Sequence, residues 1–518
     1  MKRTPLFCVC VAGLLAVVAL PVVAQERVVL ELSMEEAVAR AMENNLDIAV
    51  DRYNPEAAEE EIRDAEGFYD FTFTGLLNQR SQTTPQSNAF TGGESVKTDI
   101  STWNVGGVQA LKTGASLRAD FRNQRQDTNS IFSSFNPSYQ SSFFVNLSQP
   151  LFRGLKIDAG RQQLRVSKNN REISDVAFRQ TVINTLANTK TLYFDLIAAI
   201  DNLEAQRKSL ELAQKLLSEN EIKVRVGTLA PLDVVEAESE VASREEGVIV
   251  AENQLAEAED ALKLAIFAEH DAATWSLRIV PTDRPSTERV DVDVDAAIAK
   301  ALEQRTDVVS ARKRLQNSEY TLEYAGDLTK PAIDLVAGVG SVGVGGTFLV
   351  REGLGGEVTE TIPGGYSDAL GDVFSLENPD WSVGVQVSIP LQNRSARAQK
   401  ARAQIALDQA RTSLTRLEML VAQAVRTAGR AVETNYKRVG TTQAAQVLQD
   451  RRLDAEQKKF AAGMSTSFLV TQAQRDLALA EVAALRAAAD YRKSIVDFER
   501  VQEAGLGTGS GSITVTSN

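Results

Sequence analysis

Two stretches of the chain, residues 155–226 and 394–462, are predicted to be long helices rich in Ala, Gln, Lys and Glu. At 1.5 Å per residue, each helix would be about 100 Å long, two to three times the width of an ordinary domain. No small core can bury such a rod, so each must lie along other long helices. In the first stretch, apolar residues recur at spacings of three, four and seven, which is typical of a narrow coiled-coil seam. The seam residues are Val182, Leu186, Tyr193, Leu196, Ile200, Leu203, Leu210 and Leu217.

Each rod ends in a similar turn. The segments KVRVGTLAPLDVVEAESE, from Lys223, and KFAAGMSTSFLVTQAQRD, from Lys459, both lead from a helix through glycine and small residues into a new helix. Gly227 aligns with Gly463, and glycine supplies the backbone freedom that ends a helix. Pro231 suits the first turn of the helix that follows. One chain therefore makes the same sharp turn twice.

The repeat extends beyond the turns. MEEAVARAMENNLDIAVDRY, from Met34, aligns with DAAIAKALEQRTDVVSARKR, from Asp295, and LSQPLFRG aligns with VSIPLQNR, with Pro150 over Pro390. Such ordered matches predict an internal duplication. The predicted units are residues 25–270 and 294–505, with a linker at 271–293 and a flexible tail at 506–518. The elements expected in order are a helix (33–66 or 294–325), strands (about 69–149 or 332–390), a long helix (155–226 or 394–462), a tip (227–232 or 463–467) and a return helix (233–269 or 468–505).

Between the helices, the hydrophobic period changes from 3.6 to 2. In WSVGVQVSIP, Trp381, Val383 and Val385 alternate with polar or small residues, and YDFTFTG behaves alike. This alternation suits a lipid-facing exterior and a wet interior, although a soluble half-buried sheet gives the same pattern. The first half has room for four strands, at about 69–80, 100–110, 115–126 and 139–149. The long polar loops at 82–98 and 347–380 resemble the exterior loops of a barrel.

The N-terminus predicts export. Basic Lys2 and Arg3 precede an apolar stretch, and small residues lead to a cleavage point between Ala24 and Gln25, so residues 1–24 are predicted to be a signal peptide. A membrane anchor is the alternative, but Pro21 interrupts the apolar stretch. Cleavage removes both cysteines of the chain. The mature chain then has one histidine and no thiol, which leaves no basis for thiolate catalysis, a His-based triad or a common zinc site.

Two further partners are disfavoured. The formal net charge of −13 disfavours nucleic acid. The segment GVGSVG, residues 338–343, matches the dinucleotide fingerprint, but the residues after it cannot begin the helix that the fingerprint requires. We therefore expect no cofactor, no metal site and no catalytic residues, and the chain is not expected to be an enzyme.

The signal peptide, the duplicated unit and the paired glycine turns together resemble the TolC family of outer membrane efflux proteins. The resemblance implies a mixed α/β membrane protein in the cell outer membrane of a Gram-negative-type bacterium. A homotrimer would form a β-barrel of about 12 strands, or about 18 if each protomer gives six, both counts being even. A long α-helical barrel would extend from it into the periplasm. The implied partners are outer-membrane lipid, a periplasmic adaptor protein and an inner-membrane transporter.

The implied function is a passive exit duct for efflux or type I secretion. The alternative is an exported coiled-coil protein that braces the periplasm without conducting. By the resemblance, the tips dock the adaptor through Gly227, Thr228, Leu229, Gly463, Met464 and Ser465.

An acidic pair can mark the second tip in this family, but Leu469 and Gln472 stand there. Asp233 and Glu236 occupy the equivalent positions in the first repeat, three residues apart on one helix face. They would form a carboxylate ring at the entrance, or they would only complement a helix dipole.

Overall fold

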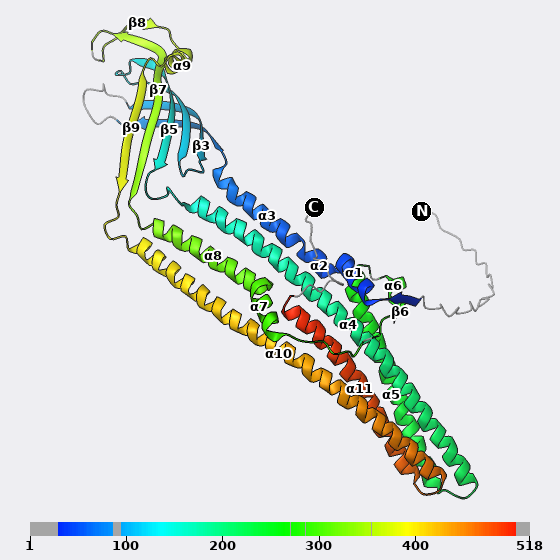
Figure 1. Ribbon diagram of the computed structural model, residues 1–518. Coiled ribbons are helices and arrows are strands. Elements are labelled where there is room, and N and C mark those ends of the chain that lie inside the picture. Colours follow the sequence, from blue (N-terminus) through cyan, green and yellow to red (C-terminus); the bar gives the residue numbers. More distant parts are fainter. Residues whose placement is uncertain (1–28, 86–94, 270, 285, 354, 504–518) are drawn as a thin grey trace, which may run out of the picture.

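The computed structural model describes residues 29–85, 95–269, 271–284, 286–353 and 355–503. The predicted signal peptide, with Ala24 and Gln25, and the predicted tail 506–518 lie outside the described residues. A sheet occupies one end of the molecule and helical turns occupy the other, with long helices between them (Figure 1).

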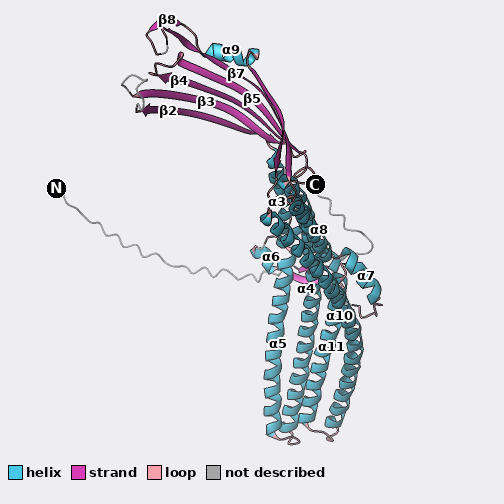
Figure 2. Cartoon of the chain, turned by 90° about the vertical axis from the view of Figure 1, so that its left-hand side faces the viewer, coloured by secondary structure: helices cyan, strands magenta, loops and turns pink. Residues whose placement is uncertain are grey.

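Four long helices form the lower part of the molecule. The two rods are 67 and 68 residues long, or about 100 Å each, and two shorter helices return beside them. Figure 2 shows all four side by side. They are α4 (Ala159–Arg225), α5 (Pro231–Ile266), α10 (Arg394–Ala461) and α11 (Ser467–Val501).

The seam predicted along α4 is confirmed over its first part. Val182, Leu186, Tyr193, Leu196 and Leu203 are all buried. Farther along, Leu210 and Leu217 were expected in the seam, but their neighbours Ser209 and Leu216 are buried instead. Leu216 packs against residues of α10 and α11, so the buried side of α4 changes where its packing partners change.

Each of the two predicted helices before the strands is divided in the structure. The first region was expected to be one helix over 33–66, and the second one helix over 294–325; the chain instead becomes extended at Asn45 and again at Arg305. The Asn45 side chain accepts hydrogen bonds from the next helix, which makes the break a helix start. Ser33 and Glu36 form a capping box at the start of the first helix, in which the Glu36 amide donates to the Ser33 hydroxyl oxygen and the Ser33 amide donates to the Glu36 carboxylate. The helices are α1 (Met34–Asn44), α2 (Leu46–Asp51), α3 (Tyr53–Glu66), α7 (Val294–Gln304) and α8 (Thr306–Asp327).

Part of the region expected to be a linker, 271–293, is structured. It begins with α6 (Ala272–Ser276) and continues into β6 (Arg278–Pro281), which pairs in parallel with β1 (Val29–Leu32). Tyr193 of α4 is fully buried beneath these strands and donates a hydrogen bond to the Leu32 carbonyl oxygen at 2.9 Å. The two ends of the first half are thereby tied together halfway along the molecule.

The sheet at the other end is antiparallel throughout, in the order β2-β3-β4-β5-β7, and β7 pairs with both β8 and β9. The first half contributes four strands and the second half three, so this chain exceeds the four strands per protomer that a 12-stranded trimer would need. The fingerprint-like glycines 338–343 lie inside β7, and no helix begins there. The strands are β2 (Thr72–Thr84), β3 (Val96–Ala110), β4 (Ser116–Thr128), β5 (Phe135–Pro150), β7 (Ala332–Arg351), β8 (Val358–Ile362) and β9 (Pro379–Ser388).

One face of this sheet is apolar, as the alternation predicts. Residues paired across antiparallel strands point to the same side, and the register brings most of the large apolar residues of the six long strands onto one side. Much of this side is solvent-exposed in the single chain. We name it the apolar sheet face, and it comprises Phe73, Leu77, Val105, Leu117, Phe121, Phe143, Val145, Leu335, Val339, Trp381, Val383, Val385 and Val387.

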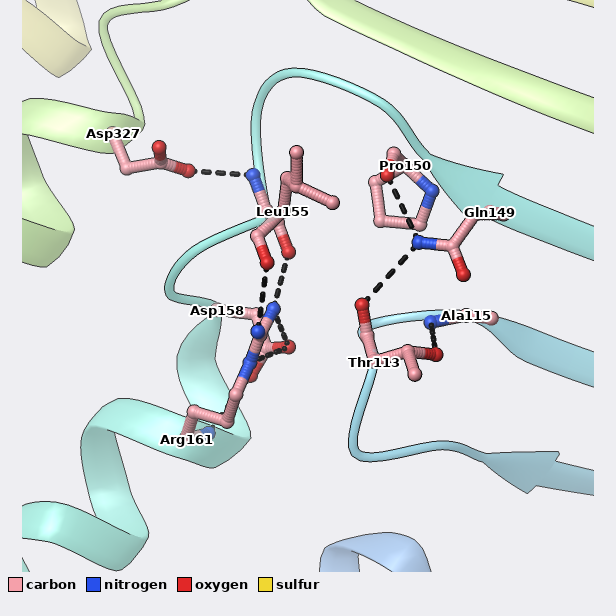
Figure 3. Close-up of polar contacts among 9 residues, drawn as sticks. Thr113, Ala115, Gln149, Pro150, Leu155, Asp158, Arg161 and Asp327 are labelled. Atoms are coloured by element: carbon pink, nitrogen blue, oxygen red, sulfur yellow. Dashed lines mark hydrogen bonds and ion pairs between the residues drawn. The ribbon is translucent and has the colours of Figure 1, made fainter.

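The junction between sheet and helices is held by polar contacts (Figure 3). Arg161 of α4 donates to the carbonyl oxygens of Gly154 and Leu155 and to the carboxylate of Asp158. The Gly154 amide donates to the Asp327 carboxylate at 2.5 Å, and Asp327 is buried at the end of α8. The two halves of the chain therefore meet at this junction. Among the described residues, no helix has both the length and the apolarity needed to cross a membrane.

Candidate functional site

The two predicted tips are turns of the same geometry. Gly227 has a φ of 82° and Gly463 a φ of 75°, which is the left-handed region that favours glycine. In the first turn, the Thr228 amide donates to the Lys223 carbonyl oxygen at 2.9 Å and the Gly227 amide to that of Val224 at 2.9 Å. The second turn has the same two bonds, from the Met464 amide to the Lys459 carbonyl oxygen and from the Gly463 amide to that of Phe460. This pair of bonds is the Schellman motif, which satisfies the last carbonyl groups of a helix.

The predicted tip residues divide into two groups. Gly227, Thr228, Gly463 and Met464 are exposed, and Met464 has the largest apolar side chain among them, 75% exposed. Leu229 and Ser465 are half-buried instead. Leu229 packs against an apolar cluster between the helices, and the Ser465 hydroxyl donates to the Glu456 carboxylate at 2.8 Å. Beside the turns, large apolar side chains are also exposed, among them those of Val226, Leu232 and Phe468.

The two turns are joined to each other. The Lys223 ammonium lies 3.3 Å from the centre of the Phe460 ring, at the end of the neighbouring rod. Asn220 is fully buried and donates to the Ser467 hydroxyl at 2.5 Å. A cluster of apolar residues from α4, α10 and α11 lies beside these contacts: Leu216, Leu453, Phe460, Val470, Ala473 and Leu477.

A buried ion network links the return helices a few turns farther from the tips. Glu240 of α5 is 3% exposed and accepts from Arg244 of its own helix at 2.7 Å. Its other oxygen accepts from Nε of Arg475 of α11 at 2.8 Å, and Nη2 of Arg475 also donates to it. Burial opposes ionisation of Glu240, but the hydrogen bond from Arg475 and the charges of both arginines outweigh it, so the pKa of Glu240 lies below its ordinary value.

The predicted acidic pair lies at the start of α5. Asp233 is half-buried, Glu236 is exposed, and within the described chain neither carboxylate forms a salt bridge. The Asp233 carbonyl oxygen accepts from Asn220 at 3.3 Å, which fixes the backbone there. Leu469, at the equivalent position of the second repeat, is 41% exposed. Both roles proposed for the pair, carboxylate ring and dipole partner, stay predictions.

Sequence reasoning missed the contacts between the two helical hairpins, which are α4 with α5 and α10 with α11. Asn220, Glu240 and Arg475 stand in long helices of mixed polar and apolar composition, so no motif marks them. A weak signal exists for Glu240, because Arg244 follows it by four residues and pairs of this spacing share a helix face. In the described part of the chain, no group of His, Cys, Asp and Glu residues could hold a metal ion.

Comparisons with known proteins agree with this geometry. The model of the family described as outer membrane efflux protein matches residues 115–266 and 297–500. Outer membrane protein TolC of Escherichia coli (strain K12) is 24% identical over 354 residues, which are 68% of this chain and 66% of that protein, just under two thirds of its length.

Solved structures show the same fold. The Campylobacter jejuni CmeC outer membrane channel has 17% identity and a TM-score of 0.64, over 90% of this chain and 85% of that one. The Neisseria gonorrhoeae MtrE outer membrane channel, solved in an open state, has 16% identity and a TM-score of 0.59, over 91% and 89% of the two chains. At these identities, the likeness establishes the architecture of the fold.

Proposed function

Because this chain belongs to the outer membrane efflux protein family, we propose that it forms the exit duct of an efflux or type I secretion system. It is an outer membrane protein of a family of channels, with its helices on the periplasmic side. In our proposal, the duct is passive, and an inner-membrane transporter supplies the energy through a periplasmic adaptor.

The observation that carries this proposal is the open sheet. Its two edge strands, β2 and β9, are 13 and 10 residues long, and the outer side of each has no partner strand within the described chain. Long unpaired edges with exposed apolar residues require pairing elsewhere. Six long strands in antiparallel order place β2 and β9 in opposite directions, so β2 of one copy can pair antiparallel with β9 of the next. Repetition of this contact closes a ring, and in a homotrimer it would have about 18 strands.

The opposite face of the sheet supports a wet bore. It carries Arg118, Asp120 and Arg122 of β4, where Arg118 pairs with Asp120 at 2.8 Å. Asn146 of β5 pairs with Arg118 in the register and therefore points to the same side. With the apolar sheet face outward toward lipid, a closed ring would place these charges around water.

The paired turns support docking of an adaptor. They lie at the end of the molecule farthest from the sheet (Figures 1 and 2). Their exposed surface includes Gly227, Thr228, Gly463 and Met464. Two like turns per copy would give a trimer six similar surfaces, suited to repeated contact with an adaptor of matching shape.

Conductance tests the proposal against its alternative, a periplasmic brace. The purified protein is reconstituted into a planar lipid bilayer, and single-channel current is recorded at neutral pH. We expect discrete ohmic channels of uniform size. A membrane-inserted, assembled protein that passes no ion current would favour the brace.

A further inference from the structure

The polar loop predicted over 347–380 contains a helix, α9 (Tyr366–Ser375), which lies beside the far end of β7 (Figure 1). Two glycines of β7 allow its close approach. A Cβ atom at Gly343 would lie 2.0 Å from the Ala369 carbonyl oxygen, and one at Gly345 would lie 2.3 Å from that of Gly365. Any other residue at either position would push α9 off the sheet.

The register places α9 on the apolar sheet face. Gly343 pairs with Ser141 and is four residues from Val339, so its missing side chain would point to the same side as Val339 and Trp381. In a closed barrel, this is the side away from the bore. The helix is therefore not a plug inside the duct but a covering on its outer wall.

Helix α9 covers polar groups on that wall. Asn123, Ser141 and Ser341 are each 1% exposed, although they lie on the apolar sheet face. The Tyr366 hydroxyl donates to the Asn123 side-chain oxygen at 2.8 Å, and the Ser141 hydroxyl donates to the same oxygen at 2.9 Å. Without the helix, these groups would face lipid at a cost of a few kcal/mol.

The outward side of α9 is amphipathic. At 100° per residue, Ala369 and Val373 face the sheet, Phe374 lies on one flank, and Asp368 and Ser375 lie on the other. Phe374 is 72% exposed, and its ring lies 6.3 Å from that of Phe121.

The apolar flank continues the apolar sheet face. Phe121 pairs with Phe143, and Phe143 pairs with Ser341 of β7. Ser341 is two residues along β7 from Val339, which pairs with Trp381, so all of these residues lie on the same face. Phe374 therefore adds to this face at the edge farthest from the helices.

We propose that α9 is an interfacial membrane helix, with Phe374 inserted among the acyl chains of outer-leaflet lipid. This inference rests on the proposed barrel. The occupant is lipid because the exposed flank is continuous with the face that lipid would cover. Aromatic residues with polar tips mark the same level: Trp103 Nε1 donates to the Tyr366 hydroxyl at 3.3 Å, and Tyr139 contacts the Tyr366 ring. Such residues gather where membrane meets water.

Fluorescence quenching tests the position of α9. Cys8 and Cys10 are replaced by serine in the full chain, and single cysteines are then introduced as Phe374→Cys, Ser375→Cys or Val383→Cys. Each variant carries a polarity-sensitive label, and the protein is placed in lipid nanodiscs in which a fraction of the lipids bears a doxyl quencher near the head of the acyl chain. Iodide is the aqueous quencher. Ser375 is the matched control, since it is the next residue but faces the polar flank.

We expect the ratio of lipid to iodide quenching to be about threefold or more higher at Phe374→Cys than at Ser375→Cys. Equal ratios at these two positions, with strong lipid quenching at Val383→Cys, would overturn the inference and leave the barrel intact. Absence of lipid quenching at Val383→Cys would instead refute the proposed membrane barrel, and with it the inference.

Discussion

Removal of Arg475 tests the contact that joins the two helical hairpins. The substitution Arg475→Met keeps most of the stem but removes the guanidinium that binds Glu240, which is 3% exposed. Breaking a buried ion pair costs about 3–5 kcal/mol when one charge is left alone. Here Arg244 still binds the carboxylate at 2.7 Å, so we expect a loss of about 2–3 kcal/mol, in the range of hydrogen bonds to charged groups.

Hydrogen exchange can measure this loss locally. A change of 2–3 kcal/mol corresponds to a roughly 30- to 150-fold increase in the opening equilibrium. The increase should be confined to amides of α5 and α11 around Glu240 and Arg475. The control is Arg452→Met, which removes a half-exposed ion pair with Asp476 at 2.8 Å. Exposed pairs contribute about 1 kcal/mol or less, so exchange should change little there.

A second substitution separates charge burial from packing. In a Glu240→Gln background, no buried negative charge remains at this contact, so Arg475→Met should cost about 1 kcal/mol or less. Full additivity of the two substitutions, or equal exchange in Arg475→Met and Arg452→Met, would refute the claim that buried charge holds the hairpins together.

Three further predictions concern the turn glycines, Glu240 and the acidic pair of Asp233 and Glu236. Replacing Gly227 or Gly463 by alanine should destabilise the turn by about 1–2 kcal/mol. A Cβ atom there would have no neighbour within 4 Å, so the cost comes only from the left-handed backbone. The control Gly440→Ala, inside α10, should instead stabilise the protein by up to about 1 kcal/mol, and thermal unfolding measures both changes. The pKa of Glu240 is lower in the folded state than in the unfolded chain. The stability that ionised Glu240 contributes is therefore fully present above the ordinary carboxyl pKa and is lost as pH falls through the pKa of the folded state. Spin labels on α5 and α11 should move apart on acidification in the wild type but not in Glu240→Gln. The Asp233→Ala, Glu236→Ala pair should leave the reversal potential of reconstituted channels unchanged, since Asp233 lies in the first turn of α5, where an acid complements the helix dipole, and Glu236 is exposed one turn later. A loss of cation preference would support a carboxylate ring.

Local signals in the sequence predicted the helical part of the fold well. Glycine, proline and a capping box mark where helices begin and end, and the structure has its turns at Gly227 and Gly463, Pro231 at a helix start and Ser33 as a cap. The breaks at Asn45 and Arg305 were missed because neither residue is a strong helix breaker, and each break depends on packing of the short helices against the rods. The seam shift near Leu216 likewise reflects contact with the second hairpin.

The candidate site was predicted only in part. The turn residues could be found because the chain repeats them, and repetition is visible in one sequence. The contacts of Asn220 with Ser467 and of Glu240 with Arg475 join residues more than two hundred positions apart. No local pattern specifies which residue of one hairpin meets which residue of the other. The composition of α9 favours a loop, because its ten residues include Gly371 and two acids, Asp368 and Asp372.

The even number of long strands per chain limits how the circumference of the proposed barrel can change. In the proposed barrel, a copy closes with its neighbour only while its first and last strands run in opposite directions. Loss or gain of a single strand would turn one edge around and leave neighbouring copies mismatched, whereas a whole hairpin such as β3–β4 can be added or deleted without disturbing closure. The circumference of a ring built from identical copies therefore changes in steps of two strands per copy, and any variant of intermediate size should fail to assemble.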